Sequence, residues 1–592
     1  MENTMVKLRN RTFMVVVFLL AGWQSLSVMA QVGQGQTTFC NPLNLSYRFQ
    51  LEKPSRREAA DPTMVVFKGD YYLFASKSGC YWRSSDLIDW KMINSPDLPF
   101  EDYAPTVVSI RDTLFFMATN WGKNSRSIFK TADPSSGRWQ VAVDTFSKVM
   151  SDPDLFLDDD GRLYFYYGTS NQTPIYGVEL DPRTFKLIGE PVGCLNSNIS
   201  DHGWERTGDY NTRNQRPFIE GAWMTKHDGK YYLQYSAPGT EMKSYNDGLY
   251  VGASPLGPFQ LAENNPFSYK PEGFINGAGH SSTFKDKWGN TWRISTMVIS
   301  VKHMFERRLG LFPAFFDREG TFYTYTGFGD FPHHMPKKRM TGPEDYLPSG
   351  MLLSYNKPVQ VSSTLPGHPK ENVTGEEIRK FWSATTGDKG EWVAVDLQSL
   401  CSVNGVQVNF AEEGTSILGN VRGRADSIYY QYLLEYSNDG KNWRKLMDKT
   451  NNRTDVPHDF LELAAPVSAR YIRLTNYHVP DGMFALSGLR VFGKANVKAP
   501  QPVSSIKVSR DSADGRDAVL TWKKSPDAIG YNIRFGAAQN KLYKNYQVFG
   551  SDSLTIHSLN RLQRYYFTID AFNGKGVTRG TTVVGSDPPA GR

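Results

Sequence analysis

A short pattern occurs five times in the first half of the chain and sets the strongest limit on its fold. Each copy is a polar turn with Gly or Asp followed by alternating aromatic and aliphatic residues, which is typical of a hairpin that feeds a strand. The copies are KGDYYLFAS (68–76), RDTLFFMATN (111–120), DGRLYFYYGTS (160–170), DGKYYLQYSAP (228–238) and WGNTWRISTMV (288–298). Their spacing of about 40 to 70 residues is typical of propeller blades with variable loops. The repeat therefore predicts a five-bladed β-propeller over residues 35–340.

Three carboxylates stand at the starts of strand-like segments in this region. They are Asp61 in ADPTMVVF, Asp152 in SDPDLFLDDDG and Glu220 in RPFIEGAWMTK. A repeat wound around an axis brings equivalent positions together at its centre, so we expect the three side chains to share one pocket. The alternative is that each Asp-Pro is only a turn, since Asp caps turns and Pro fixes the backbone. The combination favours a functional site, because an acid beside an apolar strand needs a reason to be there.

Four further segments carry a resemblance to a known family. CYWRSSDLIDWKMI (80–93) resembles a blade strand with the pattern S-x-DL-x-x-W, and YAPTVV (103–108) resembles a W-AP-x-V motif. INGAGHSSTF (275–284) resembles a G-x-GH motif, and RRLGLFPAFFDREG (307–320) resembles a late strand that carries an arginine. With the acidic motifs, residues 37–335 resemble glycoside hydrolase family 43, a family of five-bladed propellers that act as inverting exo- and endo-glycosidases.

The resemblance implies a role for each of the three acids. Asp61 matches the general base, Glu220 matches the general acid, and Asp152 matches the residue that orients the acid and raises its pKa. Inverting hydrolysis needs such a pair, because the base activates water on one face of the sugar while the acid protonates the leaving oxygen on the other. A like charge near Glu220 would keep that acid protonated near neutral pH. Asp154 lies two residues after Asp152, on the same face of an extended segment, and is the alternative to it.

Five more residues are candidates for contact with a sugar: Trp82, Trp121, Phe218, His280 and Arg307. Aromatic faces stack on sugar rings, although each of these aromatic residues taken singly is more often part of a core. The resemblance leaves His280 two roles, either holding a water or metal ion in the channel or serving as a structural histidine. Arg307 either contacts substrate hydroxyls or pairs with an acid, and its neighbour Arg308, on the opposite face, is the alternative to it. No cofactor is expected to be required, and a structural calcium ion in the channel is left open.

A second domain is expected after a turn-rich break at MTGPEDYLPSG (340–350). Residues 345–495 contain FWSATTGDKGEWVAVDLQS and LLEYSNDGKNWRKL, and they resemble a discoidin, or coagulation factor 5/8 C-terminal type, jelly-roll sandwich. Such modules often bind carbohydrate. The loop 411–428 is long and polar, which favours it as a binding surface.

A third domain is expected over residues 500–590, which resemble a fibronectin type III sandwich with Trp522 and Tyr566 as core aromatics. We expect this tail to act as a spacer. The predicted fold class is therefore all-β, with a five-bladed β-propeller followed by a jelly-roll β-sandwich and a fibronectin III-like β-sandwich.

The first 30 residues have the pattern of a secretory signal peptide. Lys7, Arg9 and Arg11 precede an apolar stretch, Phe13 to Ala21, and a small-residue exit follows at Val28-Met29-Ala30. The stretch is too short to span a membrane well, and no later segment reaches about 18 apolar residues. We therefore expect cleavage before Gln31 and a soluble protein that is secreted or periplasmic.

Charge and cysteine content exclude some classes of partner. The formal net charge is +7, and the Lys and Arg residues are scattered, so nucleic acid is not an expected partner. The four cysteines lie far apart without metal-ligand spacing. Cys40 and Cys80 are the pair most compatible with a disulfide, and free buried thiols are the alternative.

The resemblance implies an enzyme that releases sugars from plant-type polysaccharide side chains. It points first to α-L-arabinofuranosidase activity, then to β-xylosidase, and then to galactosidase or galactofuranosidase activity. The insertion 196–214 before Glu220 is expected to shape the mouth of the pocket. A noncatalytic carbohydrate-binding protein is the alternative class. The sequence leaves the sugar, the linkage, exo or endo action and the oligomeric state open.

Overall fold

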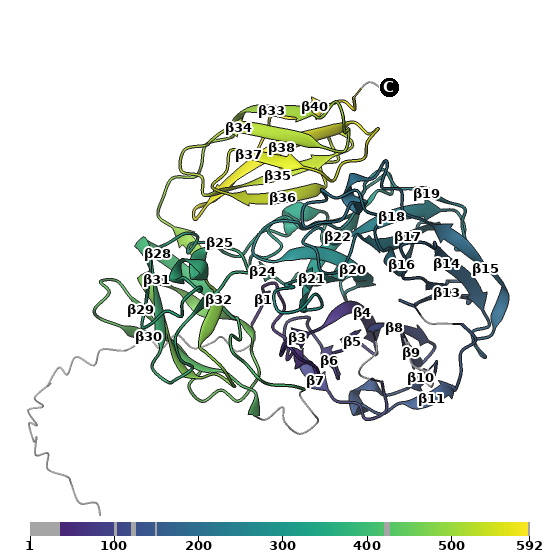
Figure 1. Cartoon of the computed structure of the whole chain (residues 1–592), viewed down its shortest axis with the longest axis horizontal. Coiled ribbons are helices and arrows are strands. Elements are labelled where there is room, and N and C mark those ends of the chain that lie inside the picture. Colours follow the sequence, from purple (N-terminus) through teal and green to yellow (C-terminus); the bar gives the residue numbers. More distant parts are fainter. Residues whose placement is uncertain (1–35, 100–102, 120–125, 149–150, 420–426, 590–592) are drawn as a thin grey trace, which may run out of the picture.

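Nearly all regular structure in the chain is β-strand, arranged in three parts (Figure 1). The computed structural model describes residues 36–99, 103–119, 126–148, 151–419 and 427–589. Four short 3₁₀ helices lie within these residues: η1 (Pro134–Ser136), η2 (Gly203–Glu205), η3 (Pro343–Asp345) and η4 (Lys370–Thr374). No helix in the described ranges is long and apolar enough to cross a membrane. The predicted signal peptide lies outside them and stays a prediction.

The first part consists of five four-stranded antiparallel sheets, which we name blades 1 to 5. Blade 1 holds β4 (Ala60–Phe67), β5 (Asp70–Ser76), β6 (Tyr81–Ser84) and β7 (Lys91–Ile93). Blade 2 holds β8 (Tyr103–Ile110), β9 (Thr113–Thr119), β10 (Ile128–Thr131) and β11 (Gln140–Val143). Blade 3 holds β12 (Asp154–Leu157), β13 (Leu163–Tyr167), β14 (Ile175–Leu180) and β15 (Leu187–Leu195). Blade 4 holds β16 (Glu220–His227), β17 (Lys230–Ala237), β18 (Asn246–Gly252) and β19 (Phe259–Leu261). Blade 5 holds β20 (Asn276–Lys285), β21 (Thr291–Val298), β22 (Arg307–Phe316) and β23 (Phe322–Thr324).

The first strands of the blades form a closed ring. Each contacts the first strand of the next blade, in the order β4, β8, β12, β16, β20 and back to β4 (Figure 1). The repeated segments of the sequence form the second strands, and the turns Lys68-Gly69 and Asp228-Gly229 have positive φ at both positions, as type I′ hairpin turns require. The predicted five-bladed propeller is therefore confirmed, and we call this part the propeller.

β13 shows why the aromatic-rich repeats form inner strands. Leu163 and Phe165 pack in a cluster with blade 2, whereas Tyr164 and Tyr166 pack in a cluster with blade 4. All four side chains are at most 1% exposed. A strand buried on both faces needs large apolar side chains at successive positions, and each such burial contributes about 1.5–3 kcal/mol.

Two short sheets lie beside the propeller. β1 (Thr38–Phe39) pairs with β24 (His333–His334), which joins the two ends of the propeller segment. β2 (Arg48–Phe49) pairs with β3 (Arg57–Glu58). β3 leads directly into β4 and brings charged side chains close to the centre of the ring.

The second part, residues 351–495, forms one eight-stranded sheet that wraps an apolar core, and we call it the middle sandwich. Bulges interrupt its two longest strands, which lets one sheet cover both sides of the core. Trp382 is fully buried in that core. The strands are β25 (Met351–Leu352), β26 (Val359–Val361), β27 (Trp382–Ser383), β28 (Trp392–Phe410), β29 (Gln431–Ser437), β30 (Arg444–Asp448), β31 (His458–His478) and β32 (Ala485–Ala495).

The third part, residues 504–586, is a two-sheet β-sandwich that we call the tail sandwich. Its first sheet holds β33 (Ser504–Arg510), β34 (Ala518–Lys523) and β37 (Ser553–Ile556). Its second sheet holds β35 (Gly530–Gly536), β36 (Lys544–Phe549), β38 (Tyr565–Asn573), β39 (Gly576–Thr578) and β40 (Val584–Ser586). Trp522 packs in the core as predicted, but the core tyrosine of β38 is Tyr565, and Tyr566 is only partly buried, because adjacent strand residues face opposite ways. The resemblance to fibronectin type III domains stays a prediction.

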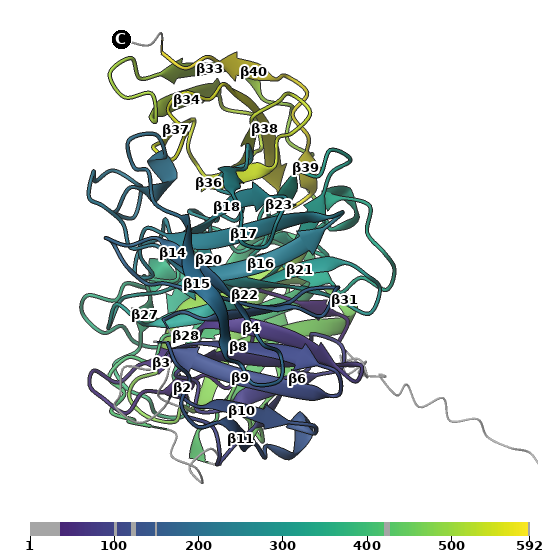
Figure 2. The same cartoon turned by 90° about the vertical axis from the view of Figure 1, so that its right-hand side faces the viewer.

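The tail sandwich is docked on the propeller, so the expectation that it is a spacer is wrong. Figure 2 shows it beside β18 and β23. The Trp204 indole donates to Asn560 Oδ1 at 2.9 Å, and the Gly203 amide donates to the Leu559 carbonyl at 2.9 Å. Trp204 is fully buried. This part of the insertion 196–214 therefore holds the tail.

The loop that begins at residue 411 of the middle sandwich also docks on the propeller as far as it is described. Glu412 pairs with Arg57, which is fully buried and also pairs with Asp455 at 2.5 Å. Ser55 Oγ donates to the Ile417 carbonyl at 2.6 Å. Part of the predicted binding surface is therefore a contact between the two parts, at Glu412, Ile417 and Gly419, whose amide donates to the Gln50 carbonyl at 2.8 Å.

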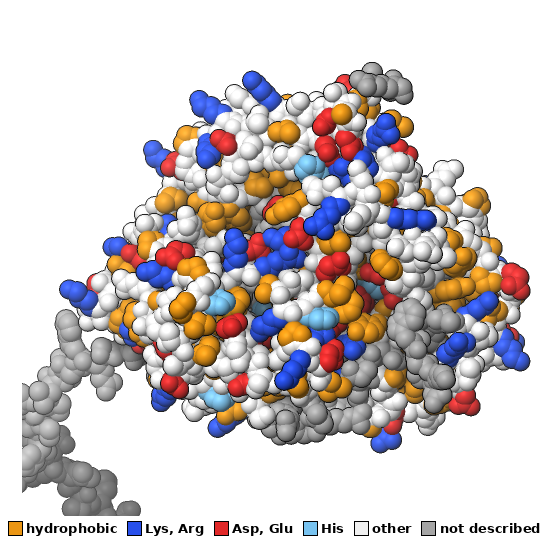
Figure 3. Space-filling view, viewed as in Figure 1, with side chains coloured by type: hydrophobic (Ala, Val, Ile, Leu, Met, Phe, Trp, Pro, Cys, Tyr) orange, Lys and Arg blue, Asp and Glu red, His pale blue; other side chains and the backbone are white. Residues whose placement is uncertain are grey.

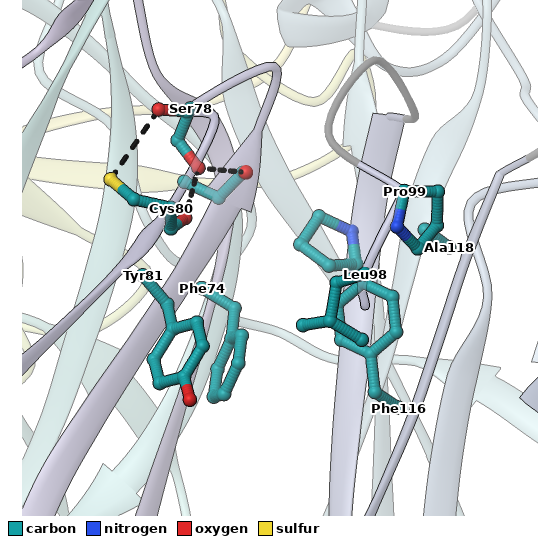
Figure 4. A pocket seen from close by; sticks show the side chains of 10 residues that line it. Phe74, Ser78, Cys80, Tyr81, Leu98, Pro99, Phe116 and Ala118 are labelled. Carbon is teal, nitrogen blue, oxygen red and sulfur yellow. Dashed lines mark hydrogen bonds between the residues drawn. The ribbon is translucent and has the colours of Figure 1, made fainter. Parts of the chain in front are cut away.

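All four cysteines are free, so of the two alternatives left open by the sequence the structure shows free thiols; Cys40, Cys80 and Cys401 are buried, and Cys194 is partly buried. The Cys80 thiol donates to the Ser78 carbonyl at 3.4 Å (Figure 4). A small pocket of about 20 Å³ between blades 1 and 2 lies beside it, lined by Phe74, Tyr81 and Phe116 among others. This pocket has room for about one water and is too small for a sugar, because a cavity of about 10–15 Å³ on this measure already holds one water.

Candidate active site

Each blade places at least one residue in the left-handed backbone region at or near the start of its first strand. The φ angles are Asp61 50°, Ala104 44°, Asp152 46°, Gly221 61° and His280 40°. Four of these residues carry a side chain, and that conformation costs a non-glycine residue roughly 1–2 kcal/mol. Such strain is typical of functional sites, where it re-aims a side chain. The sequence Asp-Pro or Ala-Pro marks the position in blades 1 to 3.

A hydroxyl on the second strand of the preceding blade fixes this turn in four of the five blades. It accepts the backbone N–H of the left-handed residue at 2.7–2.8 Å. The pairs are Thr296 with Asp61, Ser76 with Ala104, Thr119 with Asp152, and Ser236 with His280. Each turn is thus set by the neighbouring blade, so the ring itself positions the side chains at its centre.

The turns direct the three predicted acids toward His280. His280 Nδ1 lies 3.1 Å from Asp61 Oδ1 and 3.8 Å from Asp152 Oδ2. One ligand atom each from Asp152, Glu220 and His280 lie within 4.8 Å of one another. Asp61, Asp152 and His280 are nearly buried, with Asp61 only 6% exposed. Three carboxyls from three blades therefore share one centre.

Asp61 is held in its ionised form. The Arg307 guanidinium lies 3.2 Å from Asp61 Oδ1 and donates to Glu58 Oε1 at 2.7 Å, while the Ser76 hydroxyl donates to Asp61 Oδ2 at 2.6 Å. Burial alone would raise the pKa of Asp61, but Arg307 and His280 outweigh it and hold that pKa well below its usual value.

Glu220 is in the opposite state. Burial and the nearby Asp152 raise the pKa of Glu220 to about 7, against a smaller lowering effect of His280 and Tyr245. The Tyr245 hydroxyl donates to Glu220 Oε1 at 2.6 Å. Burial also raises the pKa of Asp152, whose Oδ1 accepts from Thr119 at 3.1 Å. At neutral pH, Glu220 can therefore supply a proton beside an ionised Asp61.

His280 and Arg307 pair with the acids. Burial by itself would lower the pKa of His280, but Asp61 first, and then Asp152 and Glu220, raise it to about 9. The imidazolium then donates from Nδ1 toward Asp61. Of the two roles left open for Arg307, the structure shows the pairing with an acid. Contact of either side chain with a sugar stays a prediction.

Within the described ranges, one group of side chains has ligand atoms close enough together to hold a metal ion. It consists of Asp152, Glu220 and His280. Calcium prefers six to eight oxygen ligands, whereas this group offers two carboxyls and an imidazole whose Nδ1 already faces Asp61. The donor set does not by itself fit calcium, and the structural calcium ion stays a prediction.

Asp154, the alternative to Asp152, lies deeper in the channel. It is 1% exposed, its Oδ2 accepts the Met224 amide at 2.8 Å, and burial raises its pKa to about 8. It lines a cavity of about 490 Å³ at the other end of the channel. The structure therefore brings Asp152 to His280 and places Asp154 elsewhere.

The three aromatic candidates have different outcomes. Trp82 is 1% exposed and packs in the core against Tyr47, so its assignment to the sugar pocket is wrong. β6 turns its side chain inward between neighbouring strands. Phe218 is 48% exposed two residues before Glu220, and its contact with a sugar stays a prediction. Trp121 lies outside the described residues.

Several supporting residues were missed from the sequence. The hydroxyls that fix the turns stand at the ends of the repeated segments, as in FAS (74–76) and MAT (117–119), so the repeat carried a signal for them. Tyr245 had no such signal. Arg293 and Asp247 form a fully buried ion pair, and the Ser236 hydroxyl joins it to the His280 turn by donating to Asp247 at 2.6 Å.

The fold and the site together define a class: a β-propeller with acid–base chemistry at one end of its channel. Residues 54–327 match the family described as Glycosyl hydrolases family 43, and residues 358–483 match the family described as F5/8 type C domain. The resemblance drawn from the sequence is confirmed for these two parts. The propeller thus contains the segment that matches the glycosyl hydrolase family, and the middle sandwich contains the segment that matches the F5/8 type C domain.

Three relatives show how far this similarity extends. A non-reducing end alpha-L-arabinofuranosidase of Bacteroides ovatus, BoGH43B, is 26% identical over 319 residues, covering 49% of this chain and 54% of its own length. A beta-D-galactofuranosidase of Aspergillus niger, xynD, is 24% identical over 265 residues, covering 38% and 69%. An arabinoxylan arabinofuranohydrolase of Paenibacillus polymyxa is 22% identical over 494 residues, covering 70% and 72%. The chain thus spans about half the length of the first of these relatives.

Proposed function

We propose that this chain is an inverting glycoside hydrolase with Asp61 as the general base and Glu220 as the general acid. The observation that carries the proposal is a pair of carboxyls in one site whose pKa values are moved in opposite directions, one well below its usual value and the other to about 7. Such a separation assigns the base and the acid of a catalytic pair.

The geometry supports one sequence of proton movements. Asp61 takes a proton from a water molecule, and that water attacks the anomeric carbon from the face opposite the leaving group. The bond from that carbon to the glycosidic oxygen breaks, and the Glu220 proton moves to the oxygen. Asp152 keeps Glu220 protonated beforehand, while Arg307 and His280 stabilise the ionised base.

We propose an α-L-arabinofuranosyl group on a plant-type polysaccharide side chain as the substrate. The names of two of the three relatives, an alpha-L-arabinofuranosidase and an arabinoxylan arabinofuranohydrolase, support this choice. The third relative's name, beta-D-galactofuranosidase, and that of a Butyrivibrio fibrisolvens xylosidase/arabinosidase keep galactofuranosides and xylosides as alternatives.

The test is hydrolysis of aryl α-L-arabinofuranoside, β-xyloside and β-galactofuranoside, with product analysis after digestion of arabinan, xylan and arabinogalactan. We expect the arabinofuranoside to be the best substrate. Asp61→Asn is the inactive control on the aryl glycosides and the polysaccharides, and Glu220→Gln is the inactive control on the polysaccharides, whose leaving groups need a proton. A wild-type protein as inert as both variants on the whole panel would contradict the proposal and favour a noncatalytic carbohydrate-binding protein.

A further inference from the structure

Charged residues of the middle sandwich reach the propeller beside the candidate active site. Glu377 pairs with Lys243, and Arg379 donates to Asp209 Oδ2 at 2.7 Å and to the Glu241 carbonyl at 3.1 Å. Lys243 is only 7% exposed, so this pair is largely shielded from water. Figure 3 shows acidic and basic side chains side by side in the middle of the face where the three parts of Figure 1 meet.

The residue between these two charges is apolar and supports the same region. The Ile378 amide donates to the Phe274 carbonyl at 2.9 Å, and its side chain is 4% exposed. It packs in a cluster with Ala278 and Met297. These two residues are close neighbours in sequence of His280 and Thr296, so the sandwich backs the strands that carry the site.

The propeller segment held by Glu377 and Arg379 also reaches the catalytic groups. At one end of it, Thr240 Oγ1 accepts from Arg307 at 2.9 Å, and at the other end Tyr245 donates to Glu220 at 2.6 Å. The two contacts with the sandwich, at residues 241 and 243, lie between them. A second domain therefore holds this short segment at two positions that lie between the two that touch the site.

On the other side of the site, adjacent residues divide between the acids and the sandwich. Arg307 faces Asp61, whereas Arg308 donates from Nε to His458 of the sandwich at 2.9 Å. β3 (Arg57–Glu58) repeats the division, because its second residue pairs with Arg307 and its first pairs with the sandwich. Because successive side chains of a strand point to opposite faces, these strands contact the acids with one residue and the middle sandwich with the next.

We propose that Glu377 and Arg379 are positioning residues, which fix the segment 239–245 and so hold Tyr245 against Glu220 and Thr240 against Arg307. The F5/8 type C domain is then a part of the active centre. The kinetic consequence rests on the proposed function, whereas the effect on the segment 239–245 does not. A small misplacement of groups that orient an acid or base is enough to slow a reaction by about 10- to 100-fold.

The test is the double variant Glu377→Gln/Arg379→Ala in the full chain, which changes no residue of the propeller. We expect kcat on the best aryl glycoside to fall about 10- to 100-fold with little change in KM, because no substrate contact is removed. Amide hydrogen exchange in 239–245 should become faster while exchange in blades 1 to 3 stays that of the wild type, and Tm should fall because the shielded Lys243 loses its partner. The variant Glu377→Gln/Arg379→Lys should keep a higher kcat than Glu377→Gln/Arg379→Ala, because a lysine keeps the positive charge opposite Asp209.

The matched control is Asp396→Asn/Arg470→Ala, which removes an ion pair of 2.8 Å within the same sandwich. It should leave kcat and exchange in 239–245 unchanged. Wild-type kcat together with wild-type exchange in the Glu377→Gln/Arg379→Ala variant would overturn the proposal, as would a loss of kcat that only follows a loss of folded protein. If the wild type hydrolyses nothing on the panel, the proposed function fails, and the exchange measurement still decides whether the segment is held by the sandwich.

Discussion

The two ends of the propeller channel are built from the same five strands, yet they differ in chemistry. Where the strands begin, left-handed turns bring Asp61, Asp152, Glu220 and His280 together. Further along, the same strands present mostly apolar side chains around a cavity of about 490 Å³. The comparison teaches that left-handed turns near the strand starts are enough to add a charged site to a channel whose lining is mostly apolar further along.

Asp152 and Asp154 give this comparison at the scale of two residues. Burial raises the pKa of both. Asp152 faces His280 and lies close to Glu220, whereas Asp154 accepts the Met224 amide in the apolar half of the channel. Their neighbours differ, so we expect their substitution to have different effects on activity.

The largest effect should come from the base. In Asp61→Asn, kcat/KM should fall by about 10²- to 10⁴-fold, because the amide cannot take a proton from water. The neighbouring Arg307 keeps Glu58 as a partner at 2.7 Å, so Tm should remain near that of the wild type. Steady-state kinetics and thermal unfolding measure the two. A variant that retains wild-type kcat/KM would show that the charged end of the channel is not the site.

The next largest effect should be a shift in the pH dependence of kcat/KM in the variant Asp152→Asn. Glu220 acts when protonated, so wild-type activity should decrease as pH rises through about 7, the pKa to which burial and Asp152 raise that acid. Removing the negative charge lowers the pKa of Glu220, so the basic limb should move to lower pH. The measurement is kcat/KM against pH for both proteins. A limb that stays in place would mean that Asp152 does not control the protonation of Glu220.

Tyr245→Phe should move the same limb in the opposite direction, with a smaller loss of rate. The tyrosine hydroxyl donates to Glu220 and favours its ionised form, so its removal raises the pKa of Glu220. Activity should then persist to higher pH than in the wild type. Comparing this profile with that of Asp152→Asn gives an internal control, and two shifts of the same sign would contradict the assignment.

The smallest effect is expected at the apolar end. Burial raises the pKa of Asp154 to about 8, so the group is largely neutral at pH 7, and Asn keeps an oxygen that accepts the Met224 amide. Asp154→Asn should therefore leave kcat/KM and its pH profile close to those of the wild type. A loss comparable to that of Asp152→Asn would break the comparison between the two ends.

The fold followed from the sequence because its strongest signal is local. Turn residues and alternating aromatics recur five times, and each copy forms an inner strand such as β13, whose side chains are buried on both faces. The position of the acids at strand starts also followed from the repeat. Asp152 was preferred over Asp154 because it shares an Asp-Pro with Asp61, and the shared left-handed turn gives the physical reason.

What could not be predicted depends on contacts between distant segments. Trp82 was assigned to the sugar pocket because an aromatic side chain has the same composition signal in a core and in a pocket. The docking of the tail through Trp204 and the contact of Glu377 with Lys243 join residues far apart in the sequence. Such pairs leave no local pattern, so only the three-dimensional structure shows them.

Leaving-group dependence tests the central assignment most directly. Glu220→Gln and Asp61→Asn would each be assayed on a dinitrophenyl glycoside, whose leaving group needs no proton, and on an alkyl glycoside, whose leaving group does. We predict that Glu220→Gln loses most of its activity on the alkyl glycoside and little on the dinitrophenyl glycoside, whereas Asp61→Asn loses activity on both. Equal losses of Glu220→Gln on the two substrates, or the reverse pattern between the variants, would contradict the roles assigned here.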